Sequence, residues 1–238
     1  YQAAHAFGSF QDLVSDIPVE DIEETIPDFH NTPKRYDRLM RVVDTDPRGR
    51  LAEVTAEVDF VKARKAMLSK FIDLRSRGDL PVRITHNDTK INNVMMDVES
   101  DEAVCVIDLD TVMPGLSLYD FGDLVRTAVS PAAEDERDLS KVNVRMPMFE
   151  ALAEGYIDGC HCLCDAELDN LAFAGILISL ETGMRFLTDH LEGDVYFKIY
   201  QDGQNLDRAR TQFRLVELLE ERQLEMESCV DRLAKARS

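Results

Sequence analysis

The sequence predicts a mainly α fold of the α+β class, in which one small β-hairpin interrupts a series of helices. Three observations support this prediction. Apolar residues recur at helical spacing over most of the chain, short β-type runs occur only in its middle part, and 45% of the 238 residues are hydrophobic. We expect residues 1–238 to share one core and to form a single helical unit.

The first third of the chain predicts three helices. Residues 1–16 carry apolar side chains at close to a 3.6-residue period. A second helix is expected to begin at Thr32-Pro33, with the threonine as N-cap, and to run through Val43. A long helix is expected over 51–77, and Gly78 would end it.

Short strands and then further helices are expected in the rest of the chain. Residues 81–84 predict one strand, and 93–96 pair with 103–107 as a hairpin across a polar turn. Met113-Pro114-Gly115 is interpreted as a turn. Helices are then expected over residues 119–128, 135–158, 166–190 and 205–236.

Charge and composition exclude several classes of partner. The chain has 27 basic and 46 acidic residues, a net charge of −19, which argues against nucleic acids and anionic membrane surfaces. We find no uninterrupted run of about 18 apolar residues and no signal peptide, and so expect no membrane partner. Five cysteines without a spaced framework favour a reducing compartment, and we expect a cytoplasmic protein.

Three of the cysteines form a short cluster with one histidine, Cys160-His161-Cys162-Leu163-Cys164. Its one-residue gaps do not match the two-to-four-residue gaps of zinc knuckles, and the sequence offers no second cluster to complete a ligand set. We therefore interpret these residues as structural.

A polar segment in the middle of the chain predicts phosphoryl transfer. That reaction needs a carboxylate beside the attacking hydroxyl and metal ions held against the phosphates. Kinase catalytic loops read His-Arg-Asp-x-x-x-x-Asn, and His86, Asp88 and Asn93 have the same spacing, with Asn87 in place of the arginine. We expect Asp88 to act as the base, His86 and Lys90 to complete the catalytic set, and Asn93 to give an oxygen to Mg²⁺.

Further carboxylates follow the hairpin. Asp108 ends its second strand and is expected to bind the metal, and Asp110 would join it if the strand continued, because alternate residues share a face. Asp120-Phe121-Gly122 spells the metal motif of protein kinases but lies too far along the chain. We therefore expect Asp120 and Asp123 to support the loop by binding its backbone, or to cap the next helix.

At these residues the chain resembles the aminoglycoside phosphotransferase and choline kinase group of small-molecule kinases, and within it the N-acetylhexosamine 1-kinase branch. The segments that carry the resemblance are residues 27–32, 86–93, 107–115, 186–197 and 205–210.

The resemblance implies a two-lobed, protein kinase-like enzyme. A β-rich N-terminal lobe would bind the nucleotide, and a helical C-terminal lobe would carry the catalytic loop, the metal ligands and the substrate site. The implied reaction is phosphorylation of the anomeric hydroxyl of N-acetylglucosamine or N-acetylgalactosamine by ATP with Mg²⁺. The resemblance also implies Asn87, Arg185 and Tyr196 as contacts to the sugar.

The chain departs from that pattern in one respect. Residues 1–238 contain no glycine-rich strand-turn-strand and no strand lysine. We therefore expect the chain to be the C-terminal lobe, with a missing N-terminal lobe as its main intramolecular partner, and to be inactive alone. Two alternatives stay open: a kinase for choline, an aminoglycoside or homoserine, or a non-catalytic, free-standing lobe that serves as an interaction module.

Overall fold

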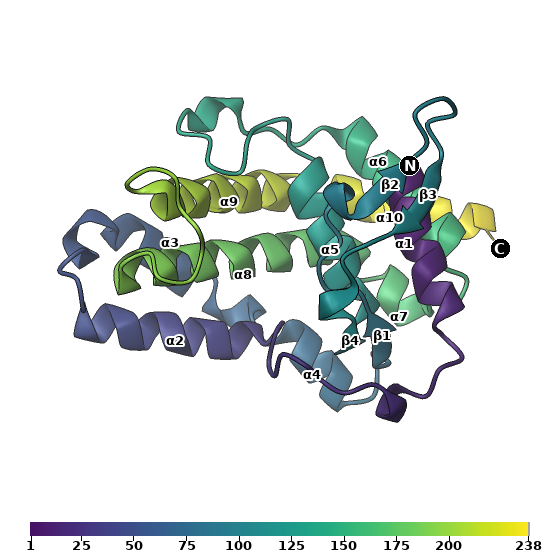
Figure 1. Ribbon diagram of the computed structural model, residues 1–238, viewed down its shortest axis with the longest axis horizontal. Coiled ribbons are helices and arrows are strands. Elements are labelled where there is room, and N and C mark those ends of the chain that lie inside the picture. The colour runs from purple at the N-terminus through teal and green to yellow at the C-terminus, as the bar shows by residue number, and fades with distance from the viewer. Residues whose placement is uncertain (238) are drawn as a thin grey trace.

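Helix α8, Leu171–Glu192, is the centre of the fold in the computed structural model, which describes residues 1–237 (Figure 1). All of its residues except Arg185 and Glu192 are buried, as is typical of a helix that is apolar on every face. Contrary to expectation, its length and hydropathy would suit a membrane span although Glu181 and Arg185 interrupt it. Because 94% of that stretch is buried inside the protein, α8 is a core helix.

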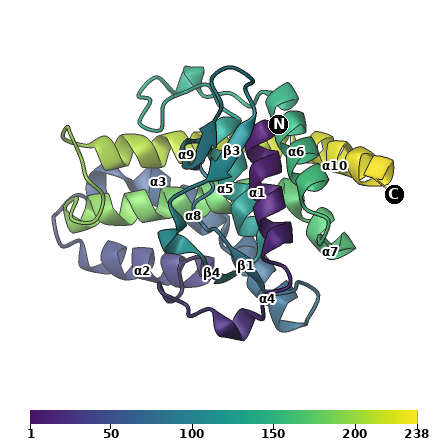
Figure 2. The ribbon, with the colours of Figure 1, turned by 45° about the vertical axis from the view of Figure 1, so that its right-hand side comes forward.

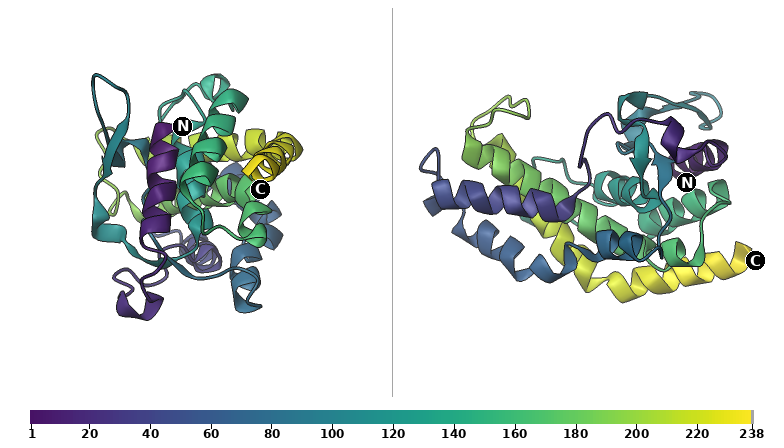
Figure 3. Two further views of the ribbon diagram at one scale, coloured as in Figure 1. Left: turned by 90° about the vertical axis from the view of Figure 1, so that its right-hand side faces the viewer. Right: turned by 90° about the horizontal axis from the view of Figure 1, so that it is seen from below.

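The other elements surround α8. Helices α2, α8 and α9 lie side by side along the long axis, while the strands, α1 and α6 lie towards one end (Figures 1 and 3). In chain order, the helices other than α8 are α1 Gln2–Leu13, α2 Thr32–Thr45, α3 Thr55–Ala63, α4 Lys70–Ser76, α5 Ser117–Ala128, α6 Met146–Gly159, α7 Asp165–Leu168, α9 Gln204–Glu221 and α10 Gln223–Arg237. This mostly helical structure confirms the predicted mainly α class.

Two separate two-stranded sheets position the polar segment. Strands β2, Val94–Met96, and β3, Ala103–Val106, form the predicted antiparallel hairpin. Strand β1, Arg83–Thr85, pairs instead with β4, Met113–Gly115, with Ile84 opposite Pro114. The interpretation of residues 113–115 as a turn is therefore wrong, since a proline is tolerated in a strand that has a free edge.

The predicted helix over 51–77 is broken into α3 and α4. Arg64 ends α3 because its guanidinium donates to the carbonyl of Phe60, which would otherwise accept the Arg64 backbone N–H in a continuing helix. The end of α4 agrees with the prediction: Gly78 is left-handed (φ 82°), and its N–H donates to the Arg75 carbonyl, as in a helix-ending Schellman motif.

Several other helix limits differ from the sequence prediction, and the expected helix over 166–190 is divided into α7 and α8. The N-cap of α2 is Asn31, whose side chain accepts the Lys34 N–H, and not Thr32. Helix α6 begins only at Met146, because the N–H of Arg145 donates to Val129 at the end of α5. The expected helix over 205–236 is divided in two at Arg222.

Helices α1 and α6 pack closely and run in the same direction, as Figure 2 shows. A Cβ at Gly155 would meet the carbonyl of Tyr1, and one at Gly159 would meet the carbonyl of His5, so only glycine permits this approach. The parallel course brings the end of α1 to the loop that follows α6.

The hairpin presents an apolar surface to solvent. The side chains of Met95, Met96, Val98 and Val104 are all exposed, and Val98 is 94% exposed. Both strands are short, and each has one edge without a partner strand.

Candidate active site

The polar segment predicted to be catalytic forms a loop between the two sheets. It leaves β1 at Thr85 and enters β2 at Val94, with a short 3-10 turn over Ile91–Asn93. Asn87 adopts a left-handed backbone conformation (φ 63°), which asparagine tolerates better than most residues. The two sheets therefore hold both ends of the loop.

Asp88 occupies the exposed side of this loop. Its side chain is 26% exposed, and its Oδ2 accepts from Lys90 Nζ at 3.0 Å and from the Asn93 amide at 3.1 Å. The same Asn93 nitrogen also donates to the Asp88 carbonyl at 2.7 Å. The structure thus brings three of the predicted residues together and leaves Asp88 Oδ1 without a partner among the described residues.

His86 lies beneath the loop and has no exposed surface. Its Nε2 lies 3.0 Å from the carbonyl of Ile107, and its Nδ1 lies 3.3 Å from the backbone nitrogen of Asp88. These contacts fit a neutral ring that donates from Nε2 and accepts at Nδ1. The rings of Phe7 and Phe10 pack against it as well, so these contacts fit a His86 that positions Asp88 from within the core.

The Asn87 side chain has a structural role and does not point to a substrate. Its amide nitrogen donates to the carbonyls of Thr85 and Thr111, and its Oδ1 accepts from the Thr85 hydroxyl. The left-handed backbone turns this side chain under the loop, where only 4% of the residue is exposed. A sugar contact through this side chain would require it to give up these hydrogen bonds.

Asp108 follows the hairpin directly. The N–H of Ile107 donates to the Asn93 carbonyl at 2.9 Å, so that Asp108 begins beside Asn93. Asp108 itself is left-handed (φ 65°) and exposed. A 3-10 turn over Leu109–Thr111 comes next, which means that the strand has already ended. The expectation that Asp108 and Asp110 share one strand face is therefore wrong.

The residues on this edge fit a hard divalent cation. Since the Asn93 nitrogen is engaged with Asp88, its Oδ1 is available as a ligand. The Asp108 and Asp110 carboxylates are exposed and accept no hydrogen bond from the described residues. An all-oxygen donor set of carboxylates and an amide is the type that Mg²⁺ prefers.

Asp120 supports the loop from below. This carboxylate is completely buried in α5 and accepts the backbone N–H groups of His86 at 3.0 Å and Asn87 at 2.7 Å, as well as the side-chain amide of Gln11 at 2.6 Å. Burial raises the pKa of the Asp120 carboxyl, and the donors oppose that rise. The Thr89 hydroxyl donates to the Asp120 carbonyl and adds a fourth contact.

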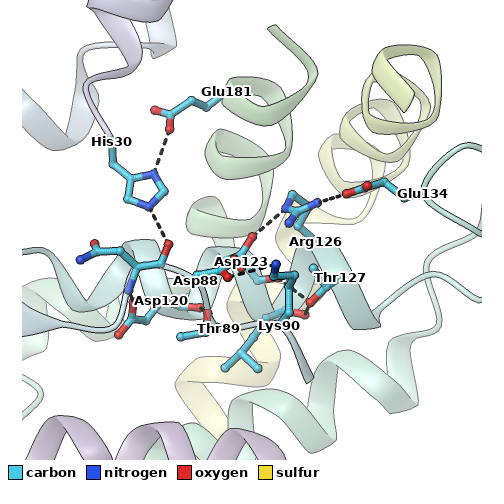
Figure 4. A network of polar contacts seen from close by, with 12 residues as sticks. His30, Asp88, Thr89, Lys90, Asp120, Asp123, Arg126, Thr127, Glu134 and Glu181 are labelled. Carbon is cyan, nitrogen blue, oxygen red and sulfur yellow. Dashed lines mark hydrogen bonds and ion pairs between the residues drawn. The ribbon is translucent and has the colours of Figure 1, made fainter. Parts of the chain in front are cut away.

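Asp123 has a different role from the one predicted. Helix α5 begins at Ser117, two residues earlier than expected, so Asp123 lies in the helix interior and neither caps it nor reaches the loop backbone. It accepts instead from Arg126 at 2.7 Å, and Arg126 continues to Glu134 at 2.9 Å (Figure 4).

Asp120→Asn should loosen the catalytic loop without unfolding the protein. An amide nitrogen would face one of the two backbone N–H donors, and each lost bond to a charged group costs about 1.5–3 kcal/mol. Amide hydrogen exchange at His86 and Asn87 should accelerate at least about tenfold. Asp138→Asn is the matched control, because Asp138 accepts a backbone N–H in an exposed turn. If exchange at His86 and Asn87 accelerated equally in this control variant, the role of Asp120 would be contradicted.

A buried contact that the sequence analysis missed holds the loop from the opposite side. Glu181, in the middle of α8, lies 2.9 Å from His30 Nδ1 and accepts from the Thr32 hydroxyl at 2.5 Å. His30 Nε2 lies 3.4 Å from the Asn87 carbonyl (Figure 4). A carboxylate that follows ten uncharged residues of an apolar run was the available signal, because a buried charge needs a partner.

Arg185 and Tyr196, the other predicted substrate contacts, line one small surface cavity together with Arg35 and Phe197. The Arg185 guanidinium lies 5.5 Å from the centre of the Phe197 ring, and Tyr196 is 66% exposed. Burial and then the nearby Arg185 charge lower the pKa of Arg35. Within the described part of the chain, no hydrogen bond or ion pair joins Arg185 or Tyr196 to residues 86–93.

Residues 1–154 of the chain match the family model described as the phosphotransferase enzyme family, APH. The match covers 154 of 238 residues and includes every catalytic, metal-binding and loop-supporting candidate from His86 to Asp123. Arg185 and Tyr196 lie beyond it.

Proposed function

The chain belongs to the phosphotransferase enzyme family, and from this premise we propose that it is the C-terminal, catalytic lobe of an ATP-dependent small-molecule kinase. One observation carries the proposal: the partly exposed Asp88 carboxylate contacts both Lys90 and Asn93 on a loop that is fixed from below. A separate nucleotide-binding lobe would supply the other half of the cleft.

Asp88 would take the proton from the acceptor hydroxyl. Lys90 and Asn93 both bind its Oδ2, which leaves Oδ1 for the incoming group. The acceptor oxygen forms a bond to the γ-phosphorus of ATP, the bond from that phosphorus to the bridging oxygen breaks, ADP leaves, and the proton moves to Oδ1. Because this transfer involves little covalent help from the protein, position contributes most of the rate enhancement.

Lys90 and a metal ion held by the oxygen ligands would balance the negative charge of the phosphate groups. The Lys90 ammonium lies 3.0 Å from Asp88 and is 43% exposed, so it can turn from the carboxylate to an entering phosphoryl group. Asn93 and Asp108, with Asp110 as a further candidate, would hold Mg²⁺. Bound there, Mg²⁺ neutralises negative charge on the phosphates.

For the acceptor we propose the anomeric hydroxyl of N-acetylglucosamine or N-acetylgalactosamine, which would become the 1-phosphate. The resemblance of residues 186–197 to N-acetylhexosamine 1-kinases supports this choice. So does the cavity beside those residues, where Arg185 offers donors and Tyr196 an exposed ring to a polar sugar. Free cysteines in the described chain accord with a cytoplasmic enzyme.

The full-length protein should consume ATP when given Mg²⁺ and either acetylated hexosamine, and should form the sugar 1-phosphate. A coupled ADP assay with a panel of acceptors checks this, and phosphorus NMR of the product identifies the phosphorylated oxygen. The panel includes choline, homoserine and an aminoglycoside. Turnover of one of these without turnover of the acetylated sugars would overturn the acceptor assignment, and no turnover of any acceptor would favour the non-catalytic lobe.

A further inference from the structure

A second cluster of metal-ligating side chains lies where the end of α1 meets the loop after α6. The carboxylate of Asp12 and the sulfurs of Cys160 and Cys162 offer ligand atoms that all lie within 4.8 Å of one another. The two sulfurs are 3.4 Å apart. His161 is close as well, since its Nδ1 lies 3.6 Å from Asp12 Oδ2.

The cluster is oriented by contacts that leave its ligand atoms available. The N–H of Cys162 donates to Asp12 Oδ1 at 3.0 Å, which fixes the carboxylate and leaves Oδ2 on the side of His161. Arg83 donates to the Cys162 carbonyl and holds the loop from β1. Cys160 is buried while the His161 side chain is 72% exposed, so the cluster has a closed floor and an open entrance.

The distances fit a tetrahedral site. Zinc binds sulfur at about 2.3 Å and nitrogen or oxygen at about 2.0–2.1 Å, so the edges of its tetrahedron measure roughly 3.3–3.8 Å. The edge between two sulfurs would be about 3.8 Å and the edge between nitrogen and oxygen about 3.3 Å. The sulfur pair at 3.4 Å and the His161–Asp12 pair at 3.6 Å each lie within about 0.4 Å of these edges, so a small shift of the side chains would complete the site. Two thiolates, an imidazole and one carboxylate oxygen select a thiophilic cation over Mg²⁺.

We propose that Asp12, Cys160, His161 and Cys162 form a binding site for a divalent cation of the zinc class. The spacing of the cysteines alone excluded this site, because the additional ligand comes from α1, some 150 residues away in sequence. The parallel packing of α1 on α6 brings that ligand into place.

Such an ion would stabilise the support of the catalytic loop. Gln11, the neighbour of Asp12, donates to Asp120, and Asp120 holds the backbone of His86 and Asn87. An ion that joins α1 to the loop after α6 would fix the end of the helix that carries Gln11. None of the four ligands takes part in the proposed kinase reaction, so metal binding can be tested without an activity assay.

Titration of the reduced, metal-free protein with Co²⁺ tests the proposal. Tetrahedral Co²⁺ bound to thiolates has an intense sulfur-to-metal charge-transfer band that aqueous Co²⁺ lacks. We expect one equivalent per chain to give this band, Zn²⁺ to remove it by displacement, and excess Mg²⁺ to leave it unchanged. Absence of the band, or an air-formed Cys160–Cys162 disulfide as the only product, would overturn the proposal.

Two variants and one control make the test specific. Cys162→Ser and Asp12→Ala should each weaken Co²⁺ binding at least about tenfold. Both positions are only partly buried, and circular dichroism checks that the variants are folded. Cys105→Ser, which removes an exposed cysteine on the hairpin, should bind Co²⁺ like the wild type; equal binding by Cys162→Ser would refute the site.

Discussion

Asp88→Asn is expected to reduce kcat of the full-length kinase at least about a hundredfold, because a positioned general base contributes roughly 10²–10⁴-fold to such reactions. The asparagine side chain has the same shape and can still accept the Asn93 amide, so the loop should keep its conformation. The amide cannot take a proton at the position of Oδ1. KM for ATP and for the acceptor should therefore change little, and steady-state kinetics with both substrates varied measure the two effects separately.

The control for this change lies in the turn of the neighbouring hairpin. Asp101 is exposed and left-handed (φ 58°), a conformation that asparagine also tolerates, so Asp101→Asn should be fully active. Equal kcat values for Asp88→Asn and the wild type would remove Asp88 from the mechanism. A loss of activity in both variants would point to a general effect of charge.

Glu181→Gln is expected to lower the free energy of unfolding by about 3 kcal/mol, because hydrogen bonds to a charged group contribute about 1.5–3 kcal/mol each and the buried Glu181 carboxylate makes two of them. The Glu181 side chain is 1% exposed and the His30 side chain 6% exposed, so water cannot replace the lost contact. Glutamine retains one acceptor oxygen, which cannot serve both His30 and Thr32. Chemical denaturation of wild type and variant measures the difference.

Glu192→Gln gives a matched control in the same helix. Glu192 pairs with Arg38, but the two side chains are 22% and 47% exposed, and such surface pairs contribute at most about 1 kcal/mol. A similar loss of stability in both variants would contradict the special role of Glu181.

The contribution of Glu181 should also depend on pH. Burial raises its pKa, but His30 and Thr32 lower it more, and the result lies below the ordinary value of 4.5. The folded protein therefore binds fewer protons at this site than the unfolded chain, so the contribution is complete above pH 4.5 and disappears as the pH falls through the folded pKa. The stability difference between wild type and Glu181→Gln should shrink across that acidic range.

The local features of the site could be predicted from sequence, and the distant ones could not. The spacing of Asp88, Lys90 and Asn93 predicts a shared loop, because those residues are neighbours in the chain, and two short apolar runs around a polar turn predict the hairpin. Asp120 is expected from the sequence to bind the loop backbone, and its carboxylate does accept the N–H groups of His86 and Asn87. The other supports come from Gln11, His30 and Glu181, whose positions depend on how helices pack. Spacing carries no information about such pairings.

Some errors have a local physical cause that the pattern of apolar residues does not show. The break at Arg64 comes from a side chain that takes a carbonyl of its own helix, and the loss of strand geometry at Asp108 comes from a single left-handed residue. Asn87 matched the position of a kinase arginine, but its short amide turns inward and binds the backbone.

The apolar hairpin surface also affects self-association of the protein in concentrated solution. Unpaired strand edges beside Met95, Val98 and Val104 are a template on which another copy can add. A net charge of −19 keeps copies apart, but that repulsion acts over only about 10 Å at 0.1 M salt. We expect added salt to favour self-association of the protein through the hairpin, because salt shortens the range of this repulsion.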